Sequence, residues 1–368
     1  MMMPNLFPTR ATRPVDRRAM SLIELLVGLV VVTTLTLTIL PAMATVRDQS
    51  QNEMSRANLM AFGQGRDQYA LDHKDRIFSY TWRAEETYIM PDGRTKTFND
   101  DQSAAAYQNG EILMRRTGRI RGQYKIQSFD ARIPHRRYSH LILLDYLSDS
   151  SEAFQTNRLG IDPADENQLV WHERPLQYNE SGSGFPYMNG IPSGYDDDTN
   201  WPTNPVRQRW PFASSYQVVP HAWQGDGNEG VYRPTTDSPH LFTGGDGIIL
   251  GRRYTSEVAF PAQKVHMHEE FDYEQSRYPY FAYDHARPEK LMFDGSINSR
   301  PSGEANDSVS PDDYDLNNPQ DPSVYPVWTQ RYVPLDAFPI PLGGLDDDTE
   351  LNMRYRWTLF GLQGVDYD

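Results

Sequence analysis

Residues 17–40 read RRAMSLIELLVGLVVVTTLTLTIL, and this stretch decides the fold. The part from Leu22 to Leu40 has 19 residues, of which Glu24 is the one charged residue. At about 1.5 Å per residue, a helix of this length spans roughly 28 Å, close to the ~30 Å hydrocarbon core of a bilayer. Apolar residues occupy every face, and its four threonines can bond to carbonyls one turn earlier. The sequence therefore predicts a transmembrane helix over residues 22–40.

The charges on either side of this segment predict its orientation. Arg10, Arg13, Arg17 and Arg18 precede it, whereas Arg47 is the one basic residue between the segment and Glu53. Because basic residues are retained on the cytoplasmic side, we expect a cytoplasmic N-terminus and an outer C-terminal part.

The same residues closely resemble the leader and first helix of type IV pilins and type II secretion pseudopilins. In that superfamily a basic leader and a small residue precede an apolar residue that becomes methylated, and Ser/Thr-Leu-Ile-Glu-Leu-Leu follows. The resemblance implies that a prepilin peptidase cleaves between Ala19 and Met20 and methylates the new amino group of Met20. Ala19 stands in place of the usual glycine, and Met20 in place of the usual phenylalanine. Glu24 is then the fifth mature residue, and Pro41 the twenty-second, where such helices often carry a proline.

The resemblance also implies a role for Glu24 in assembly. A carboxylate in lipid is costly unless a positive group meets it, and in filaments of this family the methylated Met20 amine of an adjacent subunit would do so. The alternative is that Glu24 extends into the lipid headgroups. The implied location is the bacterial inner membrane, with a single pass, a cytoplasmic N-terminus and a periplasmic domain. The implied partners are prepilin peptidase, other pilin or pseudopilin subunits and membrane lipid, and no enzymatic activity is expected.

A secretory signal peptide is the competing interpretation of the N-terminus. Ala42-Met43-Ala44 is a small-x-small cleavage site, and cleavage there would release a soluble protein that begins at Thr45. Against this, the apolar region exceeds the usual ~7–15 residues and contains Glu24. A third interpretation is an enzyme or carbohydrate-binding protein that uses the helix as an anchor.

Composition restricts the remainder of the chain. A net charge of −15 over 368 residues disfavours nucleic acid as a partner, and the absence of cysteine excludes disulfides. The 27 prolines, 25 glycines and 22 tyrosines indicate many short strands joined by turns. We therefore expect an α+β fold: a leader at 1–19, a long N-terminal helix at 20–72, and a large β-rich domain with few short helices at 73–368.

Local patterns predict individual elements of this domain. Residues 139–147 read as a short helix, and residues 299–323, which are nearly free of apolar side chains, read as a mobile loop. The strand candidates are residues 168–173, 248–253, 257–260, 264–268, 280–283 and 290–293. The aromatic-rich segments 201–210 and 278–283 are candidates for stacking on sugars, although aromatic residues mostly pack sheets.

A second resemblance lies in the C-terminal half. His285 is followed by eight residues and then by Asp294-Gly295, which is similar to a His, nine residues, Asp-Gly signature of large pilin-like proteins of planctomycete-type bacteria. Residues 356–358 and 361–366 also resemble C-termini of that group. Physically, residues 291–297 predict a hairpin with an Asp-Gly turn, and His285 is expected to hold its register. We prefer this account to a catalytic His–Asp pair, because no Gly-x-Ser-x-Gly nucleophile accompanies them.

Two kinds of metal site are candidates. His266 and His268 would share one face of a strand, as half of a transition-metal site, or they would simply flank the core. Asp272, Asp284 or His285 would complete the ligand set.

Calcium is the candidate ion for the acidic turns, although no cofactor is required by the sequence. Asp196 with Asp198, Asp346 with Asp348, and residues 225–229 cluster oxygen ligands of the kind that Ca²⁺ prefers. Resemblance to pseudopilins that lock a loop with calcium supports this, and solvated acidic loops are the alternative.

Overall fold

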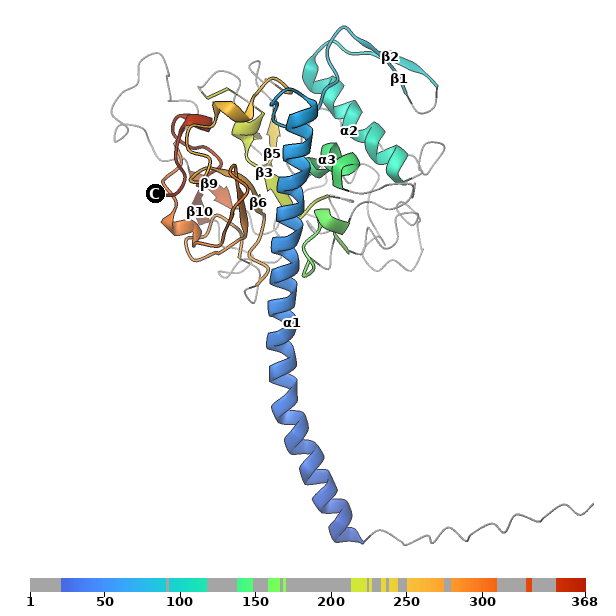
Figure 1. Ribbon diagram of the computed structural model, residues 1–368, viewed down its shortest axis with the longest axis vertical. Coiled ribbons are helices and arrows are strands. Elements are labelled where there is room, and N and C mark those ends of the chain that lie inside the picture. Colours follow the sequence, from blue (N-terminus) through green and yellow to red (C-terminus); the bar gives the residue numbers. More distant parts are fainter. Residues whose placement is uncertain are drawn as a thin grey trace, which may run out of the picture. The chain divides into compact units, whose positions relative to one another are not determined.

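The computed structural model describes residues 21–90, 93–117, 138–147, 158–165, 168–169, 213–223, 225–226, 233–235, 238–243, 250–274, 279–309, 329–332 and 349–368. Contacts divide the chain into two compact units, Met1–Ser50 and Gln51–Asp368. The fold is α+β, with one long apolar N-terminal helix and a β-sheet region that has few helices (Figure 1).

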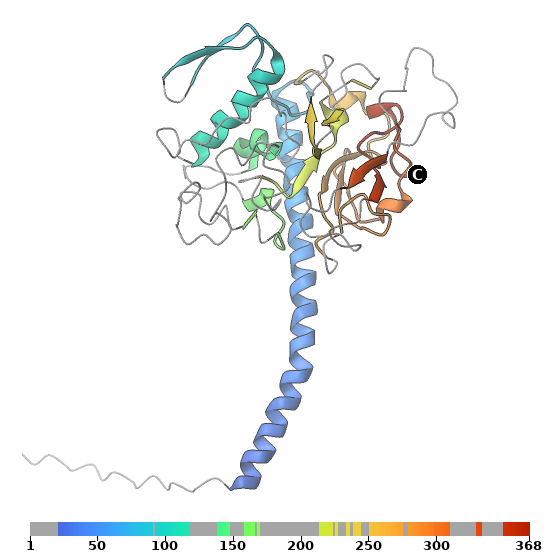
Figure 2. The same ribbon diagram turned by 180° about the vertical axis from the view of Figure 1, so that it is seen from behind.

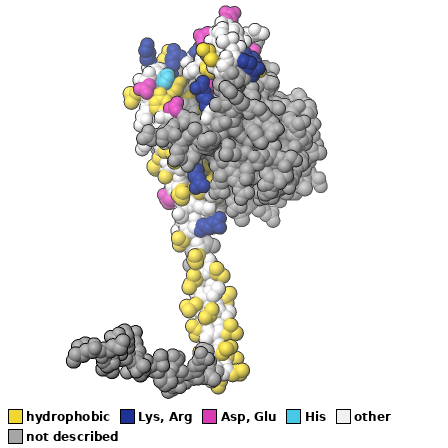
Figure 3. Space-filling view, turned by 90° about the vertical axis from the view of Figure 1, so that its right-hand side faces the viewer, with side chains coloured by type: hydrophobic (Ala, Val, Ile, Leu, Met, Phe, Trp, Pro, Cys, Tyr) yellow, Lys and Arg dark blue, Asp and Glu magenta, His cyan; other side chains and the backbone are white. Residues whose placement is uncertain are grey.

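Helix α1 runs over 51 residues, Leu22–Asp72. The predicted helix began at Met20, which lies outside the described residues, and its predicted end at residue 72 agrees with the structure. Its first part exposes large apolar side chains, and Figure 3 shows hydrophobic side chains along the visible face of this part.

The largest sheet belongs to the second unit. It has four antiparallel strands in the order β3 (Tyr216–Val218), β6 (Val265–Glu269), β7 (Lys290–Met292) and β8 (Ile297–Asn298). Strands β7 and β8 form the hairpin predicted from the Asp-Gly turn, with Leu291 opposite Ile297. Strand β6 is one of the two inner strands of this sheet and is buried along its whole length.

The remaining strands pair in twos. They are β1 (Thr87–Ile89) with β2 (Thr95–Thr97), β4 (Arg233–Thr235) with β5 (Ser238–Thr243), and β9 (Thr329–Tyr332) with β10 (Thr349–Asn352). Five short 3₁₀ turns complete the described elements: Arg158–Gly160, Pro220–Ala222, Thr255–Glu257, Ser302–Glu304 and Gly361–Gln363.

Two further helices lie among the described residues of the second unit. Helix α3 (His140–Leu147) confirms the prediction for residues 139–147, whereas α2 (Asp101–Thr117), with 17 residues, was not predicted. Helix α2 lies beside the β1–β2 hairpin in Figures 1 and 2, and the rings of Phe98 and Tyr107 lie 4.9 Å apart between them.

Several strand predictions differ from the structure. Residues 264–268 and 290–293 do contain β6 and β7. By contrast, residues 250–252 form a turn, residues 255–257 a 3₁₀ turn, and Tyr280 makes an isolated bridge to Phe271 before the chain turns again. Residues 168–169 are helical, and 170–173 lie outside the described residues. Short apolar runs such as these do not by themselves distinguish a strand from a turn or a short helix.

The second half of α1 packs on one face of the sheet. Leu59 and Phe62 are fully buried, and the Phe62 ring lies 5.8 Å from that of Tyr216 on β3. A Cβ added at Gly63 would lie 3.3 Å from Leu291, so this glycine lets β7 approach the helix closely.

The C-terminal segment, residues 353–367, covers the other face. Arg356 donates a 2.7 Å hydrogen bond to Gln217 of β3, and the ring of Tyr355 lies 5.0 Å from that of His268 on β6. Lys264, just before β6, pairs with Asp366 at 3.0 Å, and both are buried. The sheet is therefore covered on both faces, which explains why β6 does not alternate between buried and exposed positions.

Part of the loop predicted over residues 299–323 is described, namely residues 299–309. Ser302 and Ser308 are buried there, and the backbone N–H of Asn306 donates to the Asp366 carbonyl at 2.8 Å. This part packs against the C-terminal segment because its polar groups find partners there. Residues 310–323 lie outside the described residues.

Candidate functional site

The start of α1 is the site to which the sequence pointed most strongly. Ser21 precedes the first helical residue, and its Oγ accepts a 3.2 Å hydrogen bond from the backbone N–H of Glu24. In return, the Ser21 N–H donates to Glu24 Oε2 at 2.8 Å. This reciprocal pair is a capping box, which satisfies two N–H groups that a helix start would otherwise leave without a partner.

The capping box fixes the position of the Glu24 carboxylate. Glu24 Oε2 accepts the hydrogen bond from Ser21, whereas Glu24 Oε1 makes no hydrogen bond to any described residue. Around it, the side chains of Leu22, Leu25 and Leu29 are 82%, 61% and 63% exposed. One carboxylate oxygen is therefore available within an exposed apolar surface.

The four threonines of the apolar segment behave as predicted. Thr33, Thr34 and Thr36 each donate a hydroxyl hydrogen bond of 2.7–2.8 Å to the carbonyl four residues earlier, and Thr38 bonds to Leu35 at 2.9 Å. No threonine hydroxyl in this segment needs an outside partner. Glu24 is consequently the residue here whose chemistry calls for one.

The other predicted processing and assembly residues are described in part or not at all. Ala19 and Met20 lie outside the described residues. Pro41 lies within α1, and so does the alternative cleavage site at residues 42–44, since the helix is continuous through them.

The prediction that His266 and His268 share one face is wrong. Val265 and Met267 of β6 lie opposite Met292 and Leu291, which are consecutive residues of β7. Strand β6 therefore has one extra residue here, which is a β-bulge. The extra residue reverses the alternation, so the two imidazoles meet different surroundings.

Both histidines pack against the core. The His266 ring stacks on Phe293 at 4.3 Å, and its Nδ1 lies 3.5 Å from Arg66 Nη1. Burial and the Arg66 charge lower the pKa of His266 well below its usual value, and the same charge disfavours a bound cation. His268 packs on Phe281 at 4.6 Å. Among the described residues, no group of three or more His, Asp and Glu could hold a metal ion.

Asp294 and Gly295 of the His285 signature lie in the turn between β7 and β8. Asp294 Oδ1 accepts hydrogen bonds from the N–H and the hydroxyl of Ser296, and Gly295 adopts φ +89°, which favours glycine. His285 is exposed on the preceding turn, with its ring 5.6 Å from Tyr283. Asp294 and Gly295 therefore build the turn, and the role of His285 in setting the register stays a prediction.

The calcium candidates are mostly not described. Asp196, Asp198, Asp346 and Asp348 lie outside the described residues. Asp226 is described, and its carboxylate accepts two hydrogen bonds from Arg253, at 2.9 and 2.8 Å, and one from the Leu362 N–H. Asp226 therefore anchors the C-terminal segment. Asp272, a candidate partner of the histidines, is buried and accepts the backbone N–H groups of Glu274 and Arg287.

Sequence reasoning missed a buried acidic group beside α1. Ser55 of α1 bonds to Glu269 at the end of β6 and lies 2.9 Å from the hydroxyl of Tyr216. Burial raises the pKa of Asp162 to about 6 and raises that of Glu269 well above its usual value, and each carboxylate adds to the shift or bonds to the other. Polar residues 55 and 58, three apart on a helix that must pack, were the available signal.

One helix of the described part, α1, is long and apolar enough to cross a membrane. Comparison of the chain with protein-family models, with curated proteins and with solved structures found no match. The function is therefore inferred from the residues and their geometry.

Proposed function

We propose that this chain is a pilin-like structural subunit of the pseudopilin type, which assembles through α1 into a type II secretion or type IV pilus-like filament. In this proposal a prepilin peptidase cleaves between Ala19 and Met20 and methylates Met20. The helix holds the subunit in the bacterial inner membrane with its body on the periplasmic side until assembly. The chain acts as a minor or specialised subunit and not as an enzyme.

The observation that carries the proposal is the geometry of Glu24. Its Oε2 is bound to the Ser21 N–H, while Oε1 has no hydrogen bond among the described residues and lies amid exposed leucines. In a packed bundle of such helices, a carboxylate oxygen of this kind requires a cation. The amino group of a neighbouring Met20 is a cation that a processed copy of the chain, or a related subunit, would bring to this depth.

Helix continuity supports processing before residue 22 over cleavage after Ala44. Residues 42–44 lie inside α1, and the helix continues for 28 residues beyond Ala44 to Asp72. From Ser55 onward the helix packs into the body. Cleavage after Ala44 would therefore leave the body intact but would remove Met20, Glu24 and Pro41, the residues proposed for assembly.

The decisive test compares Glu24→Ala and Glu24→Gln with the parent chain in the native host. We expect both variants to be recovered in the sheared filament fraction at least roughly tenfold less than the parent, because each leaves the partner's amine without a counter-charge. Glu53→Gln is the matched control, since Glu53 lies on the same helix with a side chain that is 74% exposed. Incorporation of the Glu24 variants at the level of the parent would refute the proposal.

A second measurement tests processing on its own. Mass spectrometry of the mature chain should find an N-methylated Met20 as the first residue. A chain that begins at Thr45 would instead establish the secretory signal peptide.

A further inference from the structure

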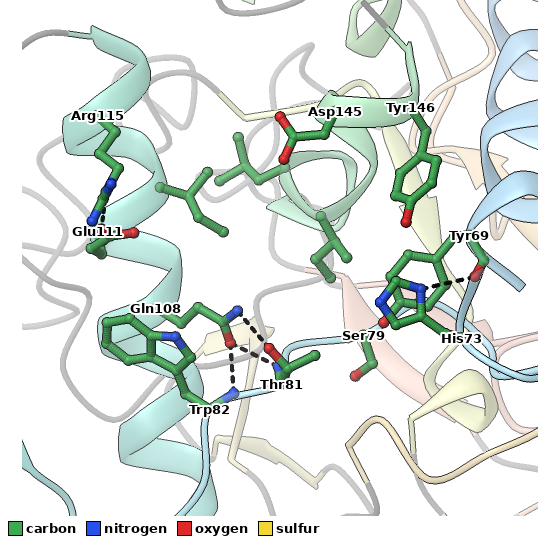
Figure 4. A pocket seen from close by; sticks show the side chains of 13 residues that line it. Tyr69, His73, Ser79, Thr81, Trp82, Gln108, Glu111, Arg115, Asp145 and Tyr146 are labelled. Carbon is green, nitrogen blue, oxygen red and sulfur yellow. Dashed lines mark hydrogen bonds and ion pairs between the residues drawn. The ribbon is translucent and has the colours of Figure 1, made fainter. Parts of the chain in front are cut away.

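A pocket of about 810 Å³ lies in the body between α2, α3 and the end of α1 (Figure 4). Its size falls within the roughly 300–1,000 Å³ typical of small-molecule sites. Helix α2 forms one wall, with Gln108, Glu111 and Arg115, and the end of α1 forms the opposite wall, with Tyr69 and His73. None of the residues considered so far for assembly, processing or metal binding lines it.

Aromatic rings lie on two sides of this pocket. Tyr69 and His73 stack on each other at 3.9 Å with an interplanar angle of 10°, and Tyr146 of α3 meets Tyr69 edge-on at 5.7 Å. On the side of α2, the ring of Trp82 stacks on that of Tyr88 at 4.2 Å. These stacks hold the rings in place, so they present ready-made apolar platforms.

The Trp82 side is fixed to α2 by one amide. Gln108 Oε1 accepts the backbone N–H groups of Thr81 and Trp82 at 2.8 and 2.9 Å, and its Nε2 donates to the Thr81 hydroxyl at 3.1 Å. Figure 4 shows these bonds at the base of the pocket. The Trp82 side is therefore held against α2 by the fold and does not depend on a ligand.

Polar groups occupy the remaining wall. Glu111 pairs with Arg115 one turn later on α2, and Asp145 extends from α3 toward that side (Figure 4). With two carboxylates and one guanidinium, the charged side chains of the lining have a net negative charge. This disfavours phosphates and carboxylates as ligands, while it offers several acceptors and a charged donor to hydroxyl groups.

Two further polar groups have capacity for a ligand. His73 Nδ1 lies 2.9 Å from the Tyr69 carbonyl, which can only accept, so Nδ1 donates in this bond and Nε2 is left for a ligand. Ser79 is 1% exposed and lines the pocket, and its Oγ makes no hydrogen bond to any residue in the described part of the chain. A buried hydroxyl without a partner is unfavourable, and a ligand hydroxyl would supply one.

We propose that this pocket binds an uncharged saccharide of one or two rings. The C–H faces of the sugar rings pack on Trp82 and on the Tyr69–His73 stack, and the hydroxyl groups meet Glu111, Arg115 and Asp145. This site differs from the segments 201–210 and 278–283 that the sequence suggested for sugar stacking. The first lies outside the described residues, and in the second Tyr280 and Phe281 are buried in the core.

The proposal does not depend on filament assembly, because every residue named for the pocket belongs to the body. The site keeps its sugar specificity whether α1 joins a filament or only anchors the chain.

The test uses the full chain, purified in lauryldimethylamine oxide so that no glycoside detergent competes for the site. Maltose, cellobiose, lactose and N,N′-diacetylchitobiose are titrated by isothermal calorimetry, and saturation-transfer NMR identifies the sugar protons in contact with the protein. We expect saturable binding of at least one of them. Arg115→Gln and Asp145→Asn should each weaken this binding by roughly tenfold.

Arg252→Gln is the matched control for Arg115→Gln. Both arginine side chains are 61% exposed and both pair with a carboxylate of α2, but Arg252 does not line the pocket. Ser79→Ala adds a variant that removes no hydrogen bond within the described part of the body, so a loss of affinity in this variant reports on the ligand. The proposal is overturned if none of the four sugars binds, if the Arg115 and Asp145 variants bind as the parent does, or if spermidine or inorganic phosphate binds in their place.

Discussion

The two halves of α1 form one continuous helix, yet their side chains have opposite environments. In the first half Leu25 and Leu29 are 61% and 63% exposed, whereas in the second half Leu59 is fully buried and Ser55 is buried with it. The second half finds its partner inside the same chain, on β3, β6 and β7. The first half has an apolar surface that must be covered by lipid or by other helices. Exposed apolar residues therefore identify the half that needs an outside partner, and buried residues, apolar and polar, identify the half that does not.

The carboxylates of the two regions differ in the same sense. Glu24 is exposed and bonded to Ser21 alone among the described residues, and we propose that a neighbouring subunit neutralises it. Asp162 and Glu269 are buried together, and this burial raises the pKa of both carboxyl groups, so that they hold protons more strongly. The carboxylate that we propose for assembly and the two buried carboxylates thus differ in the origin of the counter-charge or proton.

The comparison between the halves is tested most strongly by the same substitution in each. Leu59→Ala should lower the free energy of unfolding of the body by about 2–5 kcal/mol, because it removes buried methyl groups and leaves a cavity. Leu29→Ala should change it by less than about 0.5 kcal/mol, since this side chain is exposed. Urea unfolding of the full chain in detergent, followed by near-ultraviolet circular dichroism, measures both. Equal effects would contradict the division of α1 into two environments.

The buried acids should give a smaller effect that depends on pH. The pKa of Asp162 is raised to about 6 from a usual value of 3.8, so its contribution to stability is complete below about pH 4 and is lost as the pH rises through 6. A shift of this size corresponds to about 3 kcal/mol, and Glu269 acts in the same direction. Asp162→Asn should therefore lose less stability than the parent between pH 4 and pH 7.

The matched control for this variant is Asp67→Asn. Asp67 lies on α1 with a side chain that is 63% exposed. Urea midpoints at the two pH values provide the measurement. If parent and Asp162→Asn change in parallel, the buried-acid account is incorrect.

The smallest expected effect concerns the cap of α1. Ser21→Ala removes the hydroxyl that accepts the Glu24 N–H, so the first turn should fray and the Glu24 amide should exchange roughly fivefold faster. Hydrogen exchange of the detergent-bound chain measures this, with amides after Leu40 as the internal reference. Unchanged exchange would show that the Ser21–Glu24 pair does not hold the helix start.

The elements that the sequence predicted correctly are those with a local physical cause. The first part of α1, residues 22–40, follows from an apolar run too long for a body helix. The β7–β8 hairpin follows from Asp294-Gly295, where glycine supplies the positive φ. Helix α2 was missed although it carries a signal. Asp100 accepts the backbone N–H of Ser103, as an N-cap does, just before a run of three alanines.

The features that were not predicted depend on residues far apart in the chain. The bulge at Val265–Met267 reverses the sides of His266 and His268, and one additional residue opposite β7 leaves no mark in the sequence of β6 itself. The sugar pocket combines four segments, from Tyr69 to Tyr146, whose individual residues resemble ordinary packing. In both cases tertiary neighbours decide the chemistry, so spacing along the chain could not reveal it.

The contact between α1 and β7 also sets a schedule for biosynthesis. Arg66 donates to the Met292 carbonyl, and the two residues are 226 positions apart in the chain. This face of α1 therefore cannot pack on β7 until β7 has been synthesised. At roughly 5–20 residues per second, ribosomal synthesis imposes a delay of roughly 10–45 s. During this interval Arg66 lacks its acceptor on β7, whereas its ion-pair partner Asp67, the next residue of α1, is already in the chain.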